Sequence, residues 1–170
     1  WLVVFIDVIN KERKIIINSK DDLDEYYSRH KNDIWIGFNS RHYDQYIFKG
    51  ILCGFNPKEI NDWIILQDKP GWLFSSLLRK IPLNNYDVMY NIDRGLKTFE
   101  GYMGNNIKET SVPFDIDRKL TQEEIDETVI SESIRKEAVR SIVKSLRKQE
   151  FTIEETSLVE NSSSNFVKIV

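Results

Sequence analysis

The chain has 170 residues, 41% of them hydrophobic and 12% aromatic, and a formal net charge of -3. This length suits one globular domain with a real core, and the hydrophobic content excludes an intrinsically disordered chain. The charge excludes a strongly basic scaffold that coats nucleic acid, but it is compatible with an enzyme whose metal-binding carboxylates are themselves acidic.

Both the cysteine content and the start of the chain bear on location. The single cysteine, Cys53, lies among apolar residues, and we expect a buried, inert thiol in a reducing cytosol. The chain opens at Trp1 without a signal-peptide pattern, and its first apolar run is too short to span a membrane. Because it opens inside an expected strand, we also expect native sequence upstream and no membrane partner.

The first third of the chain alternates between strand and helix patterns. Residues 1–9 and 14–17 are rich in β-branched and aromatic side chains, which predicts a β-hairpin around the polar residues between them. Ser19 is an expected helix cap, and apolar and aromatic residues then recur on one helical face up to His30. Residues 34–38 form a short apolar run that predicts a buried strand.

The remaining elements follow the same alternation. Helices are expected over residues 43–51, ended by Gly54, and after Asn56, a cap followed by a first-turn proline. Residues 72–83 are ambiguous between strand and helix, residues 86–90 predict a strand, and residues 96–103 predict a helix. A capping box over residues 121–124 opens a long C-terminal helix. The alternation predicts an α/β fold, a mixed sheet with helices packed against it.

The strongest chemical signal follows the strand of residues 34–38. That strand delivers Asn39 to its end, and Asp44 comes in the first turn of the next helix. Ligands bind at strand ends of this kind in α/β folds. A carboxylate there can hold a divalent cation near the positive end of a helix dipole, and an asparagine can position a nucleotide or the loop.

The spacing of these residues resembles a known family. Gly37, Phe38 and Asn39, followed after three residues by Tyr43 and Asp44, resemble the second motif of DEDD-superfamily 3′–5′ exonucleases. Residues 1–128 more widely resemble bacteriophage DNA polymerase and exonuclease proteins. The resemblance implies a ribonuclease-H-like fold, two Mg²⁺ or Mn²⁺ ions and removal of nucleotides from a DNA 3′ end, most naturally single-stranded. It also implies a polymerase module as partner and the bacterial host cytosol as location.

The resemblance assigns roles to single residues. Asp44 matches the metal ligand of the second motif and Asn39 its companion, so both are expected in catalysis. Asn39, Arg41 and Tyr43 are expected to contact the substrate. One aspartate cannot hold two metal ions, and the family uses four acids. The first motif, Asp-x-Glu, is expected in a strand just before the hairpin, upstream of Trp1, since Asp7 has no glutamate two residues on.

The resemblance ends in the C-terminal helix. No Tyr-x-x-x-Asp pattern, the third motif of the family, occurs in residues 121–149, and the helical phase changes near Ser131. We therefore expect an N-terminally incomplete exonuclease-like domain over residues 1–130, a basic amphipathic helix over 131–150 and a polar, poorly ordered tail over 151–170. Asp87, before an expected strand end, is either a supporting residue near the cleft or a solvated or capping aspartate.

Three functional interpretations remain open from the sequence. The chain is a fragment of a 3′–5′ exonuclease that is inactive as given, or a catalytically degenerate module that binds nucleic acid or a partner. The third is an unrelated α/β domain in which Asp44 faces solvent. The basic residues of segment 135–148 could contact phosphates or form a solvated helical face.

Overall fold

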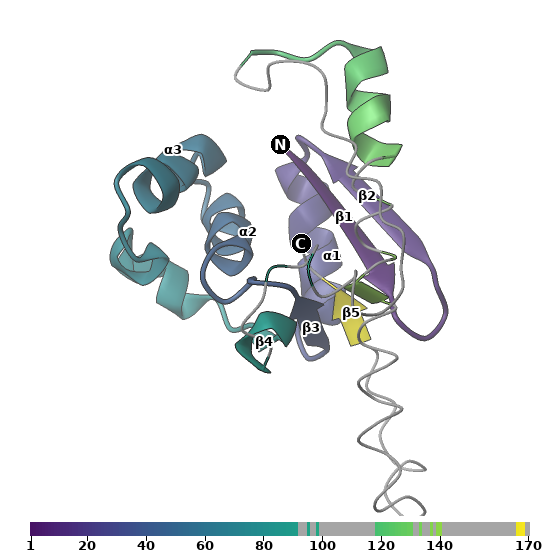
Figure 1. Cartoon of the computed structure of the whole chain (residues 1–170), viewed down its shortest axis with the longest axis horizontal. Coiled ribbons are helices and arrows are strands. Elements are labelled where there is room, and N and C mark those ends of the chain that lie inside the picture. The colour runs from purple at the N-terminus through teal and green to yellow at the C-terminus, as the bar shows by residue number, and fades with distance from the viewer. Residues whose placement is uncertain are drawn as a thin grey trace, which may run out of the picture. The chain divides into compact units, whose positions relative to one another are not determined.

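The computed structural model describes residues 1–91, 118–130 and 166–168, and singly residues 95, 98, 133, 137, 139 and 140. The chain divides into two compact units, one made of Trp1–Asn91 with Ser164–Val170 and the other of Ile92–Ser163. The first unit has the expected α/β class and carries the predicted site (Figure 1).

The elements of the first unit follow in this order: β1 (Leu2–Asp7), β2 (Arg13–Ile17), α1 (Lys20–His30), β3 (Ile34–Gly37), α2 (Asp44–Leu52), α3 (Pro57–Asn61), a π-helix (Asp62–Leu66), two 3₁₀ helices (Gly71–Leu73 and Ser76–Lys80), β4 (Asn84–Asp87), a 3₁₀ helix (Val88–Asn91) and β5 (Phe166–Lys168). The predicted hairpin, the helix after Ser19, the strand before Asn39 and the helix that follows it are confirmed.

The strands form one mixed sheet in the order β2-β1-β5-β3-β4. The hairpin strands β1 and β2 are antiparallel, and β1 is also antiparallel to β5. The strands β5, β3 and β4 are parallel to one another. The carboxyl ends of β3 and β4 therefore meet at one edge of the sheet, and the start of β1 lies at that same edge.

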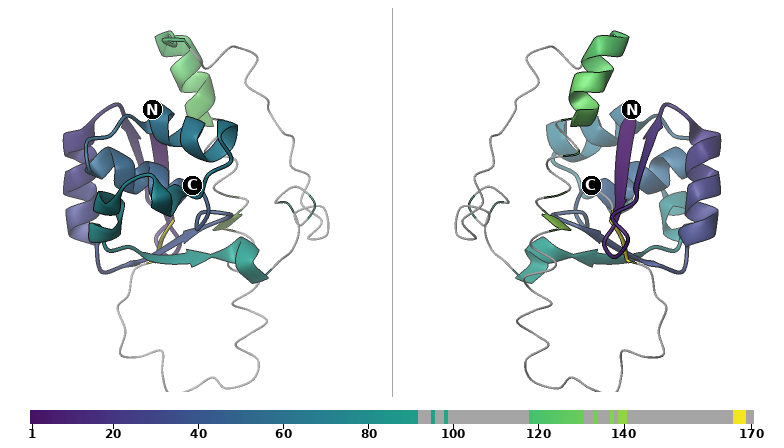
Figure 2. Two further views of the ribbon diagram at one scale, coloured as in Figure 1. Left: turned by 90° about the vertical axis from the view of Figure 1, so that its left-hand side faces the viewer. Right: turned by 90° about the vertical axis from the view of Figure 1, so that its right-hand side faces the viewer.

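The core lies between the sheet and the helices α1 and α2 (Figure 2). Phe5 from β1, Trp35 from β3 and Phe48 from α2 meet there, with ring centroids 5.5 Å apart for Phe5 and Trp35 and 5.2 Å for Trp35 and Phe48. Alternate residues of β1 on the opposite face, Val4 and Ile6, are buried as well. A strand buried on both faces is typical of the middle of a sheet.

The predicted caps are confirmed where the first unit describes them. The Ser19 hydroxyl accepts a hydrogen bond from the Asp22 N–H at 3.3 Å, and the Asn56 side chain accepts one from the Lys58 N–H at 2.9 Å. Gly54 follows α2 with a φ of 82°, a left-handed conformation that ends helices and favours glycine. These short-range signals fixed the ends of α1, α2 and α3.

The capping box of the second unit is also confirmed. The Thr121 N–H donates to the Glu124 carboxylate at 2.8 Å, and the Glu124 N–H donates to the Thr121 hydroxyl at 3.3 Å. Residues 122–130 are helical. The hydrogen bonds from Arg118, ahead of those from Thr121, lower the pKa of Glu124 to about 2.

Two stretches differ from the predicted elements. A strand is expected over residues 86–90, but β4 begins two residues earlier and ends at Asp87. It ends there because the Asp87 carboxylate accepts the Met89 N–H at 3.0 Å and the chain continues as a 3₁₀ helix. The ambiguous residues 72–83 form short 3₁₀ turns, of which the second is capped by the Ser75 hydroxyl.

Several predictions lie largely or wholly outside the described residues. These are the helix over residues 96–103, the phase change near Ser131 and the basic segment 135–148. Within the segment 151–170, the described residues 166–168 form β5. None of the helices in the described part of the chain has the length and apolar character that a membrane crossing requires.

The contact between Gly71 and Tyr46 supports a prediction about stability. A Cβ atom on Gly71 would lie 2.2 Å from the Tyr46 ring, so Gly71→Ala must displace that ring or the 3₁₀ helix. We expect the free energy of unfolding, measured in urea, to fall by about 1–3 kcal/mol.

Gly54→Ala is the matched control, since open space surrounds Gly54 and its cost comes from the positive φ alone. Replacing Tyr46 with leucine should recover part of the loss in the Gly71→Ala chain but none in the Gly54→Ala chain. Equal recovery in both would contradict the contact.

Candidate functional site

The candidate site is the loop that leaves β3 and enters α2. Gly37, the last residue of β3, is paired with Asp87, the last residue of β4, so the two strands end side by side. The loop of residues 38–43 crosses this edge and delivers Asp44 to the first turn of α2. Ligands of α/β proteins bind at such carboxyl edges.

Asp87 holds this loop in place. Its side chain is buried, and its carboxylate accepts three backbone N–H groups, from Asn39 at 2.9 Å, Arg41 at 2.8 Å and Met89 at 3.0 Å. A buried carboxylate is stable when such donors satisfy it. The Asp87 carboxylate therefore anchors a loop more than forty residues away in sequence.

The loop itself is tightly turned. Asn39 has a φ of 59°, a left-handed conformation that asparagine tolerates better than most residues, and its carbonyl accepts the His42 N–H at 3.2 Å. Ser40 is fully buried, and its hydroxyl donates to the Asn85 side-chain oxygen at 3.0 Å. The Asn39 side chain remains exposed at the edge of the sheet.

Tyr43 and Asp44 lie at the N-terminus of α2. Both are half-buried, and the Tyr43 hydroxyl donates to the Asn61 side-chain oxygen at 2.6 Å, which ties the loop to α3. Burial raises the pKa of Tyr43, and the negative charges of Asp44 and Asp62 raise it further. Asp44 is the first residue of α2, at the positive end of the helix dipole.

Arg41 extends the site toward α2. Its side chain is exposed, while its N–H binds Asp87. Burial raises the pKa of Tyr46, and the positive charge of Arg41 opposes that rise. Asn39, Arg41 and Tyr43 thus lie on the loop, and Asp44 is the first residue of α2.

The acidic residues around this loop do not form a complete two-metal site. Within the described residues, no three histidine, cysteine, aspartate or glutamate side chains cluster in a way that could hold a metal ion. Asp44 supplies one carboxylate at the start of α2. Asp87 has three N–H donors on its two oxygens, which leaves little lone-pair capacity for a metal ion.

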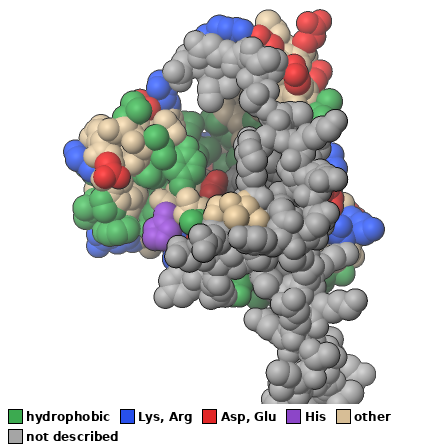
Figure 3. All heavy atoms as spheres, viewed as in Figure 1, with side chains coloured by type: hydrophobic (Ala, Val, Ile, Leu, Met, Phe, Trp, Pro, Cys, Tyr) green, Lys and Arg blue, Asp and Glu red, His purple; other side chains and the backbone are tan. Residues whose placement is uncertain are grey.

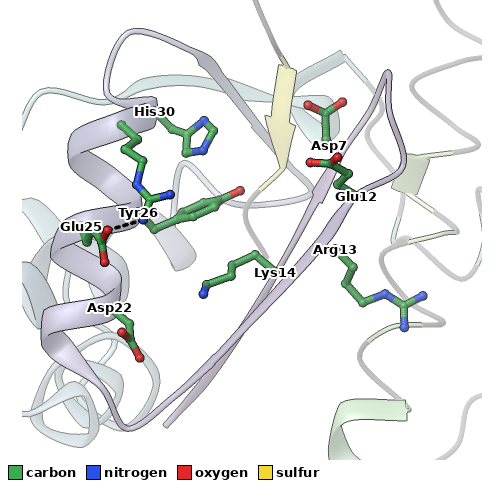
Figure 4. A pocket seen from close by; sticks show the side chains of 9 residues that line it. Asp7, Glu12, Arg13, Lys14, Asp22, Glu25, Tyr26 and His30 are labelled. Carbon is green, nitrogen blue, oxygen red and sulfur yellow. Dashed lines mark hydrogen bonds and ion pairs between the residues drawn. The ribbon is translucent and has the colours of Figure 1, made fainter.

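A polar pocket of about 250 Å³ lies at the opposite edge of the sheet, between the hairpin and α1 (Figure 4). The Tyr26 ring lies across it. The other lining residues are His30 and the charged residues Asp7, Glu12, Arg13, Lys14, Asp22, Glu25 and Arg29. Asp7 caps the hairpin turn by accepting the Ile9 and Asn10 N–H groups, each at 2.7 Å. Asp7 is therefore a turn residue, which agrees with its exclusion from the first motif.

An exposed apolar surface, which sequence reasoning missed, covers the helical segment after α3. Its members are Ile65, Leu66, Trp72, Leu73 and Leu77, and Figure 3 shows hydrophobic side chains on this part of the molecule. Trp72 is 46% exposed, although its apolar surroundings in the sequence predict core packing. In the π-helix and the two 3₁₀ helices that follow α3, only Gly71 and Leu78 are buried, so most side chains of this segment are left at the surface.

The comparisons with known proteins find no relative of this chain. No protein-family model matches it, and neither does any curated protein or solved structure. The fold and the candidate site together define a class of protein domain. It is an α/β domain in which an ordered polar loop lies at the carboxyl edge of two parallel strands.

Proposed function

We propose that this chain is the middle part of a metal-dependent 3′–5′ DNA exonuclease with a ribonuclease-H-like sheet, inactive as it stands. The observation that carries the proposal is the position of Asn39 and Asp44 on an ordered loop at the joint end of β3 and β4. The same spacing of residues resembles the second motif of that family. The half-buried state of Asp44 argues against an unrelated domain in which this residue simply faces solvent.

The topology of the sheet supports the proposal further. A strand joined by a tight turn to the start of β1 would run antiparallel to β1, and consecutive strands are usually neighbours. Since β2 covers one side of β1, such a strand would take the other side, the position of β5, parallel to β3. Its last residues would then lie at the same edge as Asp44. Acidic residues there would complete the carboxylate set.

The proposed chemistry divides between metal ions and side chains. Bound Mg²⁺ or Mn²⁺ would supply Lewis-acid polarisation of the scissile phosphate and an activated water at this edge of the sheet. Asp44 would hold one of them. Asn39 offers an amide to the terminal nucleotide, and Arg41 and Tyr43 lie beside it to contact the phosphate and sugar. The substrate is a single-stranded DNA 3′ end, and a polymerase module is the proposed partner in the bacterial host cytosol.

The test is digestion of a 5′-labelled single-stranded oligonucleotide in Mn²⁺. We expect no cleavage by the chain itself. A chain extended by a strand with Asp-x-Glu ahead of Trp1 should shorten the oligonucleotide stepwise. Asp44→Ala in that extended chain should lower the rate by about a hundredfold or more, since loss of a direct ligand exceeds the effect of losing its supporting residue.

Asp21→Ala is the matched control, because Asp21 is an exposed aspartate in the first turn of another helix, α1. It should leave the rate of the extended chain unchanged. An extended chain that stays inert, or cleaves as fast with Asp44→Ala, would refute the nuclease proposal.

A degenerate binding module is the second candidate, favoured by the use of Asp87 as a loop anchor and by the lack of a metal-holding cluster of side chains within the described residues. Fluorescence anisotropy with a labelled oligonucleotide separates the two. Binding that is indifferent to Asp44→Asn, together with an inert extended chain, would favour the module.

A further inference from the structure

The exposed apolar surface belongs to a segment that packs against the helix of the candidate site. Gly71, the first residue of the first 3₁₀ helix, lies so close to Tyr46 that a Cβ atom on it would be 2.2 Å from that ring. Tyr46 is the third residue of α2, and Asp44 is the first. The second 3₁₀ helix, Ser76–Lys80, also contacts α2. The surface is therefore attached to the first turn of the helix that begins with Asp44.

The surface contains one aromatic ring, that of Trp72, which is 46% exposed. The neighbouring rings of the segment are used in packing. Trp63 meets Phe74 edge-on with ring centroids 5.8 Å apart, and its indole N–H donates to the Pro70 carbonyl at 3.1 Å. Among the described residues, the Trp72 side chain makes no hydrogen bond and no ring contact. Its exposed ring is therefore available to stack on a flat apolar group outside the chain.

Basic side chains accompany the apolar ones. Residues 65–80 contain three basic residues, Lys69, Arg79 and Lys80, and one acidic residue, Asp68, which gives the segment a formal charge of +2 in a chain of net charge -3. All three basic side chains are exposed, and Figure 3 shows basic side chains beside hydrophobic ones in this region. Arg79 and Lys80 lie in the last turn of the second 3₁₀ helix and form no ion pair with another described residue.

Single-stranded nucleic acid complements this combination of apolar and basic side chains. Proteins that bind it without regard to sequence stack its bases on aromatic rings and contact its phosphates with lysine and arginine. A second copy of this chain would bring the same positive charges into the contact, and like charges that face each other oppose association. An anionic lipid surface would match the charge, but it would not account for the position of the surface beside the candidate site.

We propose that the exposed apolar surface binds single-stranded DNA that leads to the candidate site, with Trp72 stacked on a base and Arg79 and Lys80 in contact with phosphates. The choice of DNA and its path to Asp44 rest on the proposed function, whereas the surface itself is argued from exposure, charge and contacts. Because every base has a face that can stack, binding does not depend on sequence. Single strands are favoured over duplex, since the base faces of a duplex are already stacked on one another.

The probe is a fluorescein-labelled oligothymidine of about twelve nucleotides, a length typical of single-strand binding sites. Its matched control is an abasic oligonucleotide of the same length, which keeps the phosphates and offers no base to stack. Anisotropy titrations in EDTA would measure the Kd of both for the unsubstituted chain. We expect the abasic strand to bind about tenfold more weakly, the effect of losing one base–aromatic stack.

Two substitutions of the tryptophan separate stacking from general apolar contact. Trp72→Leu stays apolar but cannot stack, so the Kd for oligothymidine should rise about tenfold. Trp72→Phe keeps an aromatic ring and should change it by no more than about twofold. Ile9→Ala is the matched control, because Ile9 is an exposed apolar residue of the hairpin turn, and it should leave the Kd unchanged.

Salt dependence tests the basic side chains separately. Each phosphate contact with a single strand contributes about 0.7 to the slope of log Kd against log salt concentration. Arg79→Gln combined with Lys80→Gln should therefore lower that slope by about 1.4, whereas Trp72→Leu should leave it unchanged. Lys31→Gln is the control, since Lys31 is an exposed lysine at the end of α1.

Equal affinity of Trp72→Leu and the unsubstituted chain for oligothymidine would overturn the proposal. So would equal binding of the abasic strand, a comparison that needs no variant and decides if Trp72→Leu fails to fold. Two other results, each without binding of oligothymidine, would also overturn it. A dimer that Leu66→Glu disrupts would assign the surface to a second copy, and co-sedimentation with vesicles of equal parts phosphatidylserine and phosphatidylcholine would assign it to lipid.

Failure of this proposal is distinguishable from failure of the nuclease proposal, because titrations in EDTA need neither metal nor cleavage. Binding that depends on Trp72, together with an inert extended chain, would support the binding surface and refute the nuclease. An extended chain that cleaves, with the same Kd for Trp72→Leu and the unsubstituted chain, would support the nuclease and refute the binding surface.

Discussion

Asp87→Asn is expected to lower the free energy of unfolding by about 2–4 kcal/mol. Hydrogen bonds to a buried charged group are worth about 1.5–3 kcal/mol each, and the asparagine oxygen would keep some of the bonds that the carboxylate accepts. The carboxylate accepts three N–H groups and donates none. An amide keeps one acceptor oxygen and presents an NH₂ group to the remaining N–H donors. Urea denaturation would measure the loss.

Two further measurements make this prediction specific. Asp21→Asn, an exposed aspartate in the first turn of α1, should change stability by less than about 0.5 kcal/mol. Amide hydrogen exchange should accelerate at Asn39 and Arg41 more than at core amides such as that of Trp35. A loss in Asp87→Asn no larger than in Asp21→Asn would show that the loop is ordered by other contacts.

The role of Asp87 shows why part of the site was hidden in the sequence. Its hydrogen-bond partners on the loop, Asn39 and Arg41, lie 48 and 46 residues away. An aspartate at a strand end is equally compatible with a solvated, capping or metal-binding role, and the choice depends on which strand lies next to it. The contact of Asp87 with the loop depends on the parallel pairing of β3 with β4, which is a long-range feature of the fold.

The elements that the sequence predicted well depend on contacts within a few residues. The caps at Ser19 and Asn56 bind N–H groups two or three residues on, and the apolar runs of β1 and β3 mark buried strands directly. The position of Asn39 and Asp44 between a strand and a helix was predictable for the same reason. The place of β5 was not, because a three-residue strand so far from its neighbours in sequence has no local signature.

The anchored loop gives the proposed function a physical basis. A catalytic or binding side chain must be held closely in place by the residues around it. Here the backbone on either side of Ser40 is fixed by Asp87, and Tyr43 is fixed by Asn61. Asp44 therefore follows a loop whose backbone is held by hydrogen bonds. A metal ligand needs a fixed position of this kind, which an acid on a mobile surface segment would lack. Sequence spacing alone could not establish this rigidity.

Phe5→Ala is expected to have the largest effect on stability, a loss of about 3–5 kcal/mol. Phe5 is fully buried and contacts three other aromatic rings. Its ring stacks on Tyr26 with centroids 4.6 Å apart and meets Trp35 at 5.5 Å and Phe48 at 6.1 Å, both edge-on. Removing it opens a cavity between the sheet and both covering helices, and large rigid rings cannot close such a cavity by small movements.

Phe5→Leu separates the cavity from the loss of ring contacts. Leucine fills much of the same volume, so its cost should stay below about 1.5 kcal/mol, as for other volume-conserving changes. Near-ultraviolet circular dichroism should lose intensity in both variants, since both remove the stacking partner of Tyr26, whereas urea denaturation should distinguish them. If Phe5→Ala cost no more than Phe5→Leu, the site would collapse freely, and the rigid packing of β1 against α1 and α2 would be wrong.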